Sequence, residues 1–398
     1  MPDDRLAIDG GTPVRSTLLP YARQTVDASD ERAVLDALRS DYLTTGPRVD
    51  AFEEAFAEQV GARHAVAFSN GTAALHAAAH VSGLGPGTEG ITTPLTFVAT
   101  ANCVRYVGAS PVFADIRDDT MCLDMSAAEA ALTPRSRALL PVDYAGAPAD
   151  LDEALALASR ASMVVIEDAS HSLGATYRGR RVGSIAHLTT FSLHAVKHIT
   201  TGEGGVVTTA EPDLAERLRR FRNHGINADA RARAAQGSWF YDVVETGMNY
   251  RLSDIQCALG LSQLGRLAAT LTRRRELAAA YAKRLAGVAE VETPVVPQDR
   301  ESAWHIYPLR LRLERLKADR ARIFAALRAE NIGVNVHYVP VHLHSAYEGP
   351  SARGRFPRAE SAYDRLVTLP LWPGMTDGDL NDVVRAVERV MAAFGRDA

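Results

Sequence analysis

The stretch "TTFSLHAVKHITTGEGGVVTT" at residues 189–209 places one lysine, Lys197, between two short apolar runs rich in β-branched residues. Runs of this kind predict two strands. Lysines usually lie on solvated surfaces, so a cation confined between two strands indicates a functional group. Gly202, Gly204 and Gly205 follow Lys197 closely. We expect them to let the backbone pass close to the group that Lys197 binds.

Helical and strand patterns alternate on both sides of this stretch, from about residue 50 onward. The predicted strands include "HAVAF", "GITTPL", "SPVFADI", "ALLPVDYA" and "SMVVIEDA", and helical segments such as "GTAALHAAAHVSG" separate them. This alternation is typical of a mostly parallel sheet covered by helices. A helical stretch at 253–287 leads into a predicted small α/β domain. We therefore expect a large domain over residues 1–260 and a small C-terminal domain over residues 261–398.

The overall composition favours small-molecule chemistry in the cytoplasm. The 398 residues carry a net charge of −4 with the two signs interleaved, which speaks against binding to nucleic acid or to an anionic membrane. The cysteines Cys103, Cys122 and Cys257 lie far apart, a spacing that fits neither a disulfide framework nor a zinc site. The N-terminus is acidic, and no apolar run reaches membrane-spanning length. We expect a cytoplasmic protein with small-molecule substrates.

Asp168 ends the apolar run "SMVVIEDA", and Lys197 lies 29 residues further on. Open α/β sheets place ligand-binding groups at the carboxyl ends of their strands, although an Asp there can simply cap a turn. A buried carboxylate and a lysine on neighbouring strand ends are what pyridoxal phosphate needs. The lysine would form the Schiff base, and the carboxylate would keep the pyridinium nitrogen protonated.

Three further features fit such a cofactor. In "FSNGTAALHAA" the first amides of a predicted helix fall at Gly71 and Thr72, where a phosphate could bind; an ordinary capped helix start is the alternative. Ser192 could add a hydroxyl to that phosphate site, or it could be structural. Phe97, between a predicted strand and a predicted helix, could cover the cofactor ring, or it could belong to the core.

Two rival types of site receive little support from the sequence. "HYVPVHLH" contains His337, His342 and His344 but lacks an HExxH helix or a partnered carboxylate, so we predict no metal. "TGEGG" has the wrong glycine spacing for a dinucleotide site and precedes a strand. The chain contains neither a GxGxxG motif nor a P-loop.

Several motifs together carry a family resemblance. "SNGTAALHAA", "PLTFVATANCV", "IEDASHSLGA", "FSLHAVKHITTGEGGVV", "NYRLSDIQCALG" and "GVNVHYVPVHLH" occur in the order shown by the DegT-type sugar aminotransferases. The resemblance covers nearly the whole chain and implies a fold-type I pyridoxal phosphate enzyme. That fold has a mostly parallel seven-stranded central sheet covered by helices and a small C-terminal α/β domain. Related dehydratases replace the lysine by histidine, so Lys197 implies transamination.

The lysine loop and the opening "PYARQ" look most like the 4-aminotransferase of pseudaminic acid biosynthesis. That enzyme aminates a UDP-linked 4-keto-6-deoxy-N-acetyl sugar with L-glutamate as donor. The leader "LAIDGGTPVR" instead resembles members that make antibiotic sugars and aminocyclitols, so a TDP-keto-sugar or an aminocyclitol precursor stays open. A non-catalytic pyridoxal phosphate-binding regulatory protein is the alternative of another class.

The resemblance also implies roles for individual residues. Lys197 would be the Schiff-base lysine, and Asp168 would pair with the pyridinium nitrogen. His171 would lie near the ring hydroxyl and Phe97 on the ring face. Family members are dimers with shared active sites, so we expect a homodimer in which Gly71, Thr72 and Ser192 of one subunit and Asn249 of the other hold the phosphate. The segments that match the sugar-nucleotide pocket contain Tyr21, Asp41, Tyr42, Leu43, Thr44, His337, Tyr338 and Pro340.

Overall fold

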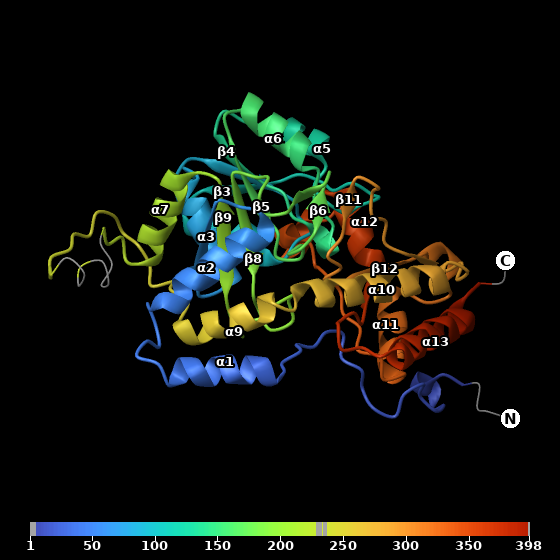
Figure 1. Ribbon diagram of the computed structural model, residues 1–398. Helices are drawn as coiled ribbons and strands as arrows, with labels where there is room; N and C mark the ends of the chain where they lie inside the picture. The colour runs from blue at the N-terminus through green and yellow to red at the C-terminus, as the bar shows by residue number, and fades with distance from the viewer. Residues whose placement is uncertain (1–4, 228–232, 234–236, 397–398) are drawn as a thin grey trace.

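The computed structural model describes residues 5–227, 233 and 237–396. A seven-stranded sheet with the order β1-β9-β8-β5-β4-β2-β3 forms its centre (Figure 1). All neighbouring pairs are parallel except the two that β9 makes with β1 and β8. The mostly parallel sheet expected from the sequence is confirmed. Its strands are β1 (His64–Phe68), β2 (Glu89–Thr92), β3 (Ser110–Phe113), β4 (Ser136–Leu140), β5 (Val164–Asp168), β8 (Leu188–Ser192) and β9 (Gly205–Thr209).

Helices cover both faces of the sheet because successive strand residues point to opposite sides. Val66 and Phe68 of β1 pack in a core with α3 (Gly71–Val81), α4 (Val98–Tyr106) and α7 (Pro212–Arg222). Ala65 and Ala67 of the same strand face a second core with α2 (Pro47–Val60) and α9 (Asp254–Leu264). Two further helices, α5 (Met125–Ala130) and α6 (Leu151–Arg160), contribute to a third core beside β4 and β5.

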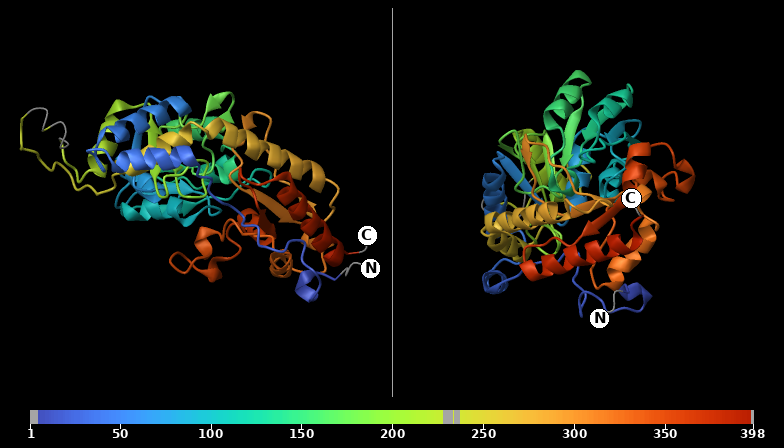
Figure 2. Two further views of the ribbon diagram at one scale, coloured as in Figure 1. Left: turned by 60° about the horizontal axis from the view of Figure 1, so that its bottom comes forward. Right: turned by 90° about the vertical axis from the view of Figure 1, so that its right-hand side faces the viewer.

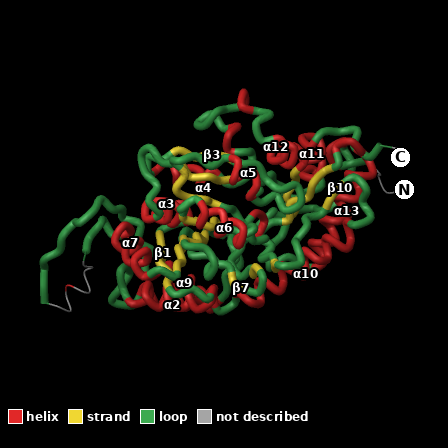
Figure 3. The backbone as a smooth tube through the Cα atoms, turned by 90° about the horizontal axis from the view of Figure 1, so that it is seen from above, coloured by secondary structure: helices red, strands yellow, loops and turns green. Residues whose placement is uncertain are grey.

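The C-terminal part has its own core. Helices α10 (Leu267–Leu285), α11 (Arg320–Ala329) and α13 (Asp377–Phe394) pack around the antiparallel strands β10 (Val291–Glu292), β12 (Tyr307–Leu311) and β13 (Leu366–Leu369). Leu6 and Leu19 from the N-terminal segment belong to this core. The described chain ends therefore lie near each other (Figure 2). Figure 3 shows the large sheet and the C-terminal part toward opposite ends of the long axis.

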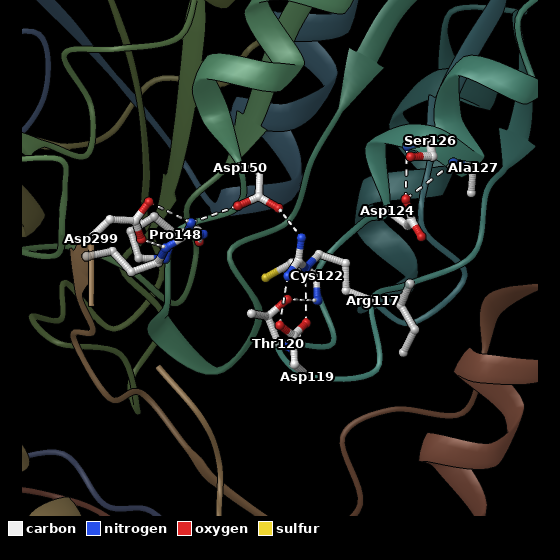
Figure 4. Close-up of polar contacts among 12 residues, drawn as sticks. Arg117, Asp119, Thr120, Cys122, Asp124, Ser126, Ala127, Pro148, Asp150 and Asp299 are labelled. Carbon is white, nitrogen blue, oxygen red and sulfur yellow. Dashed lines mark hydrogen bonds and ion pairs between the residues drawn. The ribbon is translucent and has the colours of Figure 1, made fainter. Parts of the chain in front are cut away.

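A small sheet and a group of ion pairs tie the C-terminal part to the large one. Strand β11 (Arg300–Glu301) pairs with β6 (Thr176–Tyr177), which pairs with β7 (Arg180–Arg181). Asp150 lies between two guanidinium groups. Its carboxylate is 2.7 Å from the guanidinium group of Arg300 and 3.5 Å from that of Arg117, and Figure 4 shows the contact with Arg117. The domain boundary at residues 260 and 261 stays a prediction.

Several elements differ from the sequence-based expectation. Helix α1 (Ala28–Leu38), with a capping box at Asp27, was not expected. The strand expected over "ALLPVDYA" ends at Leu140, because Pro141 has no N–H to continue a ladder, and a 3₁₀ turn η2 (Tyr144–Gly146) follows. The helical stretch at 253–287 is two helices, α9 and α10, with a break at Gly265 and Arg266.

Between α7 and α9, residues 237–250 form turns and extended stretches that contain isolated bridges but no named strand or helix. The described residues between these two helices extend away from the body of the molecule (Figures 1 and 3). Trp239 is 85% exposed and Phe240 is 64% exposed. Large aromatic side chains left in water typically mark contact surfaces. Among the helices that the structure describes, none combines the length and the apolar character needed to cross a membrane.

Candidate active site

A cavity of about 1040 Å³ opens at the carboxyl ends of β5 and β8. Ligand sites of open α/β sheets occur at this edge. Ten of the residues singled out from the sequence line it: Tyr21, Gly71, Thr72, Phe97, Asp168, His171, Ser192, Lys197, His337 and Tyr338. The tertiary structure thus brings together segments from six separate parts of the chain.

Asp168 is the last residue of β5 and is 5% exposed. Its Oδ2 accepts a hydrogen bond of 2.6 Å from the Thr100 hydroxyl on α4. Its Oδ1 accepts one of 3.1 Å from the Ser170 amide. Donors on both oxygens hold the carboxylate in one orientation. Asp168 is therefore more than the turn cap that the sequence left open.

Lys197 lies in the turn after β8, and its amide donates to the His194 carbonyl at 2.9 Å. Burial lowers the pKa of its amino group to about 8, against an opposing effect of Asp168, and the positive charge of Arg274 adds to the lowering. Within the described part of the chain, the Lys197 amino group forms no hydrogen bond or ion pair. An amine that is largely desolvated and unpaired is suited to act as a nucleophile.

The start of α3 supplies a site for an anion. The Asn70 side chain caps the helix by accepting from the Ala73 amide at 2.8 Å, which leaves the amides of Gly71 and Thr72 directed out of the helix. A Cβ on Gly71 would lie 3.0 Å from the Cβ of Ser192, so glycine permits the two segments to approach. A Cβ on Gly205 would lie 2.4 Å from the Asn70 carbonyl oxygen. Gly205 thus makes room for the start of α3.

An aromatic and histidine wall completes the cavity. Phe97 is 56% exposed, so it is no core residue, and its ring centroid lies 5.8 Å from that of Tyr338. The Tyr338 hydroxyl lies 3.0 Å from Nε2 of His171. Burial, with a smaller effect of the Lys197 charge, lowers the pKa of His171 well below its usual value. His171 is consequently a neutral hydrogen-bonding group at neutral pH.

The three histidines weighed as metal ligands have separate partners. His337 Nδ1 lies 2.9 Å from the Thr368 hydroxyl, and His342 Nε2 lies 3.0 Å from a Glu360 oxygen. His344 is exposed. The described residues contain no cluster of three or more histidine, cysteine or carboxylate side chains suited to a metal.

Some predicted residues lie outside the cavity lining of this chain. The exposed turn at 41–44 joins α1 to α2, and Thr44 forms a bridge with Ser253. Asn249 forms a bridge with Asn223 at the base of the long loop. Pro340 lies two residues after the cavity residue Tyr338. The amide of the residue after Pro340, Val341, donates to the Pro94 carbonyl. The proposed roles of these residues stay predictions.

Two buried residues near Lys197 escaped the sequence analysis. His305 lines the cavity, and its ring centroid lies 4.4 Å from that of His171. Arg274 is 1% exposed and donates to the carbonyls of Trp304, His305 and Leu371 at 3.0–3.1 Å. Arg274 sits in a run of three arginines and His305 in an ordinary strand-like run, so neither carried a local signal.

A half-buried lysine without an ion pair, a held carboxylate, a free helix N-terminus and an exposed aromatic face meet in one cavity, and they define a pyridoxal phosphate site of the fold-type I class. Residues 24–388 match the DegT/DnrJ/EryC1/StrS aminotransferase family. The chain belongs to this family, and its cofactor is pyridoxal phosphate. It is a sugar aminotransferase.

Individual relatives agree with this assignment. The chain is 41% identical over 381 residues to the spore coat polysaccharide biosynthesis protein SpsC of Bacillus subtilis, covering 95% of this chain and 98% of SpsC. Its structure is similar to that of Helicobacter pylori PseC, an aminotransferase involved in the biosynthesis of pseudoaminic acid. The TM-score is 0.88 at 31% sequence identity, and the match covers 95% of this chain and 100% of PseC. It is also similar to the PMP form of the putative sugar aminotransferase Spr1654 of Streptococcus pneumoniae. The TM-score is 0.88 at 30% sequence identity, and the match covers 94% of this chain and 99% of Spr1654.

Proposed function

We propose that this aminotransferase moves the amino group of L-glutamate to a nucleotide-linked keto-sugar, at position 4 of a UDP-4-keto-6-deoxy-N-acetylhexose. The observation that carries the proposal is the half-buried amino group of Lys197, which has no ion pair within the described residues and lines one cavity with Asp168. The similarity to PseC supports the choice of sugar. Glutamate and the keto-sugar would leave as 2-oxoglutarate and the amino sugar.

Pyridoxal phosphate, when bound, supplies a protonated ring that takes up the electron pair of a substrate carbon–hydrogen bond. Asp168 would stabilise the positive charge of the ring nitrogen, because Thr100 and Ser170 hold its carboxylate in one orientation. Lys197 carries the substrate proton in both half-reactions. Its lowered pKa keeps a substantial fraction of its amine neutral near physiological pH.

Other residues of this chain orient the cofactor. Gly71, Thr72 and Ser192 bind the phosphate through amides and a hydroxyl where α3 begins. His171 is neutral and hydrogen-bonded to Tyr338, which suits it to contact the ring hydroxyl. Phe97 presents an exposed face to the cavity and covers the ring.

The active form in this proposal is a homodimer in the cytoplasm. Asn249 and the turn at 41–44 lie outside the cavity lining of their own chain, which suits them to complete the cavity of a second copy. The exposed Trp239 and Phe240 provide an apolar contact surface for that copy. The buried free thiols Cys103, Cys122 and Cys257 suit a reducing compartment.

A panel of UDP- and TDP-linked keto-sugars, each incubated with the holoenzyme and L-glutamate, tests the proposal. Mass spectrometry of the nucleotide sugar should show amination of the UDP-4-keto-6-deoxy-N-acetyl sugar and equimolar 2-oxoglutarate. Preferred amination of a TDP-keto-sugar or an aminocyclitol precursor would replace the proposed substrate. A holoenzyme whose absorbance glutamate leaves unchanged would contradict glutamate as donor.

A further inference from the structure

Two buried carboxyl groups lie next to each other behind the catalytic strand end. Glu167 precedes Asp168 on β5. Asp143 lies just beyond the end of β4, the strand next to β5 in the sheet. Both side chains belong to residues that are 0% exposed. The two carboxyl groups are side-chain hydrogen-bond partners of each other. Two ionised carboxylates in direct contact repel each other strongly in a medium of low dielectric constant, so one of them must carry a proton.

The hydrogen bonds of the pair show where that proton lies. Asp143 accepts twice, from the Ala149 amide at 2.8 Å and from the Ser172 hydroxyl at 2.5 Å. Glu167 accepts once, from the Thr189 hydroxyl to Oε2 at 2.8 Å. Its other oxygen, Oε1, is buried and has no donor. The two donors to Asp143 fit an ionised carboxylate. The contacts of Glu167 instead fit a protonated carboxylic acid, in which Oε2 is the carbonyl oxygen and Oε1 is the hydroxyl.

The charges around the pair agree with this assignment. Burial, followed by the charge of Asp143, raises the pKa of Glu167 well above its usual value. Asp168 is a further carboxylate that acts on both groups, and it too raises their pKa values. The groups that donate to the pair are hydroxyls and an amide. A proton therefore neutralises one of these two buried carboxylates. Other buried carboxylates are neutralised by an ion pair, as Glu53 is by Arg222.

We propose that Glu167 is a neutral carboxylic acid in the folded protein, that its Oε1–H donates a hydrogen bond to the Asp143 carboxylate, and that this pair sets the electrostatic surroundings of Asp168, the carboxylate that faces the cavity. Glu167 is thus a positioning residue. It limits the negative charge behind β5, and it joins β5 to the segment whose amide at Asp143 donates to the Asp168 carbonyl at 3.1 Å. The effect on Asp168 rests on the proposed role of that residue toward the cofactor ring.

Isotope-edited infrared spectroscopy of the wild-type holoenzyme tests the neutral acid directly. We expect a carbonyl stretching band of a protonated carboxyl group at neutral pH. The band should shift when glutamate residues are labelled with ¹³C and stay in place when aspartate residues are labelled. A band that follows the aspartate label, or the absence of any such band, would overturn the proposal. Turnover is not measured, so this result is independent of the proposed substrate.

A pair of matched variants assigns the band to one residue. Glu167→Gln should remove it, because the glutamine amide donates the same hydrogen bond without a carboxyl group. Glu360→Gln is the control. Glu360 is also a buried glutamate, but it accepts from the Gly354 and Phe356 amides and pairs with His342, and these contacts lower its pKa. Persistence of the band in Glu167→Gln, or its loss in Glu360→Gln, would contradict the assignment.

The influence on Asp168 has a separate readout. Glu167→Leu removes the donor and leaves the Asp143 charge without its partner, so we expect the pH dependence of the visible cofactor absorbance to shift from that of the wild type. Glu167→Gln should restore the wild-type pH dependence, because it keeps the hydrogen bond. Identical pH profiles for Glu167→Leu and the wild type would show that the pair has no influence on Asp168.

Discussion

Thr100 on α4 donates a 2.6 Å hydrogen bond to the carboxylate of Asp168 at the end of β5. The two residues are 68 positions apart in the chain, and both are buried. A helix that covers the sheet thereby fixes the carboxylate that we propose to pair with the cofactor ring. Thr100 is a positioning residue. Its hydrogen bond is a contact that an Asp acting only as a turn cap would not need.

Replacing Thr100 by valine keeps the shape of the side chain and removes this hydrogen bond. Hydrogen bonds to charged groups contribute about 1.5–3 kcal/mol, so we expect kcat to fall by about tenfold or more. Thr100→Ser keeps the hydroxyl and should stay within about threefold of the wild type, since both donor and acceptor are retained. Steady-state kinetics with glutamate and the accepted keto-sugar would measure both variants. Equal rates for Thr100→Val and Thr100→Ser would contradict the positioning role.

Lys197→Ala should abolish transamination and the visible absorbance of the bound cofactor, because no other group in the cavity can replace an unpaired amine beside Asp168. Lys283 is a suitable control, since it is an exposed lysine near the end of α10. Lys283→Ala should keep both the colour and the rate. Normal turnover by Lys197→Ala would refute the assignment of the catalytic lysine.

The reactivity of Lys197 should depend on pH in a characteristic way. Burial lowers its pKa to about 8, so the neutral amine becomes the major form as the pH rises through that value. In cofactor-free protein, the initial rate of colour formation with added pyridoxal phosphate should therefore rise with a midpoint near 8. A midpoint close to the ordinary lysine value of 10.5 would show that the amine is solvated.

Gly71→Ala tests the phosphate site. The new Cβ would lie 3.0 Å from the Ser192 Cβ, which forces the two segments apart where the amides must converge. We expect the affinity for pyridoxal phosphate to fall by about tenfold, which corresponds to about 1.4 kcal/mol. Gly85→Ala places its Cβ 4.0 Å from the nearest neighbour and serves as the control. Titration of the cofactor-free proteins by absorbance compares the two variants, and equal affinities would exclude Gly71 from the phosphate site.

Arg300→Met tests the connection between the two parts of the molecule. The Arg300 side chain is 4% exposed and bonds to Asp150 at 2.7 Å and to the Pro148 carbonyl at 2.7 Å. Arg300→Met leaves Asp150 with the longer 3.5 Å contact to Arg117. Breaking a buried pair typically costs about 3–5 kcal/mol, so the free energy of unfolding should drop by about 3 kcal/mol, the lower end of this range.

The exposed pair of Arg160 with Glu129 supplies the comparison for Arg300, since its side chains are 60% and 57% exposed. Arg160→Met should cost less than about 1 kcal/mol, because water screens an exposed ion pair. Urea unfolding followed by circular dichroism measures both variants. Similar losses in the two would show that the Asp150–Arg300 contact adds no specific stability.

Local patterns in the sequence were sufficient for the sheet and for much of the site. Strand periodicity and turn residues are local properties, so β1, β5 and β8 and the start of α3 could be located without a structure. The break between α9 and α10 could not, because Gly265 and Arg266 lie in a helical pattern and the break depends on packing. Helix α1 has a capping box at Asp27 that the sequence displays, and this signal was overlooked.

The sequence by itself determined the fold class and the family, and it singled out the residues proposed to carry the chemistry, since strand and turn preferences act over short range and Lys197, Asp168 and the α3 start have local signatures. Only the tertiary structure decided which of these residues share a cavity. It also revealed the partners Thr100, Arg274 and His305, and the proximity of the buried carboxyl groups of Glu167 and Asp143. The physical reason is that burial, charge compensation and hydrogen-bond geometry arise from segments distant in the chain, and no local pattern encodes them.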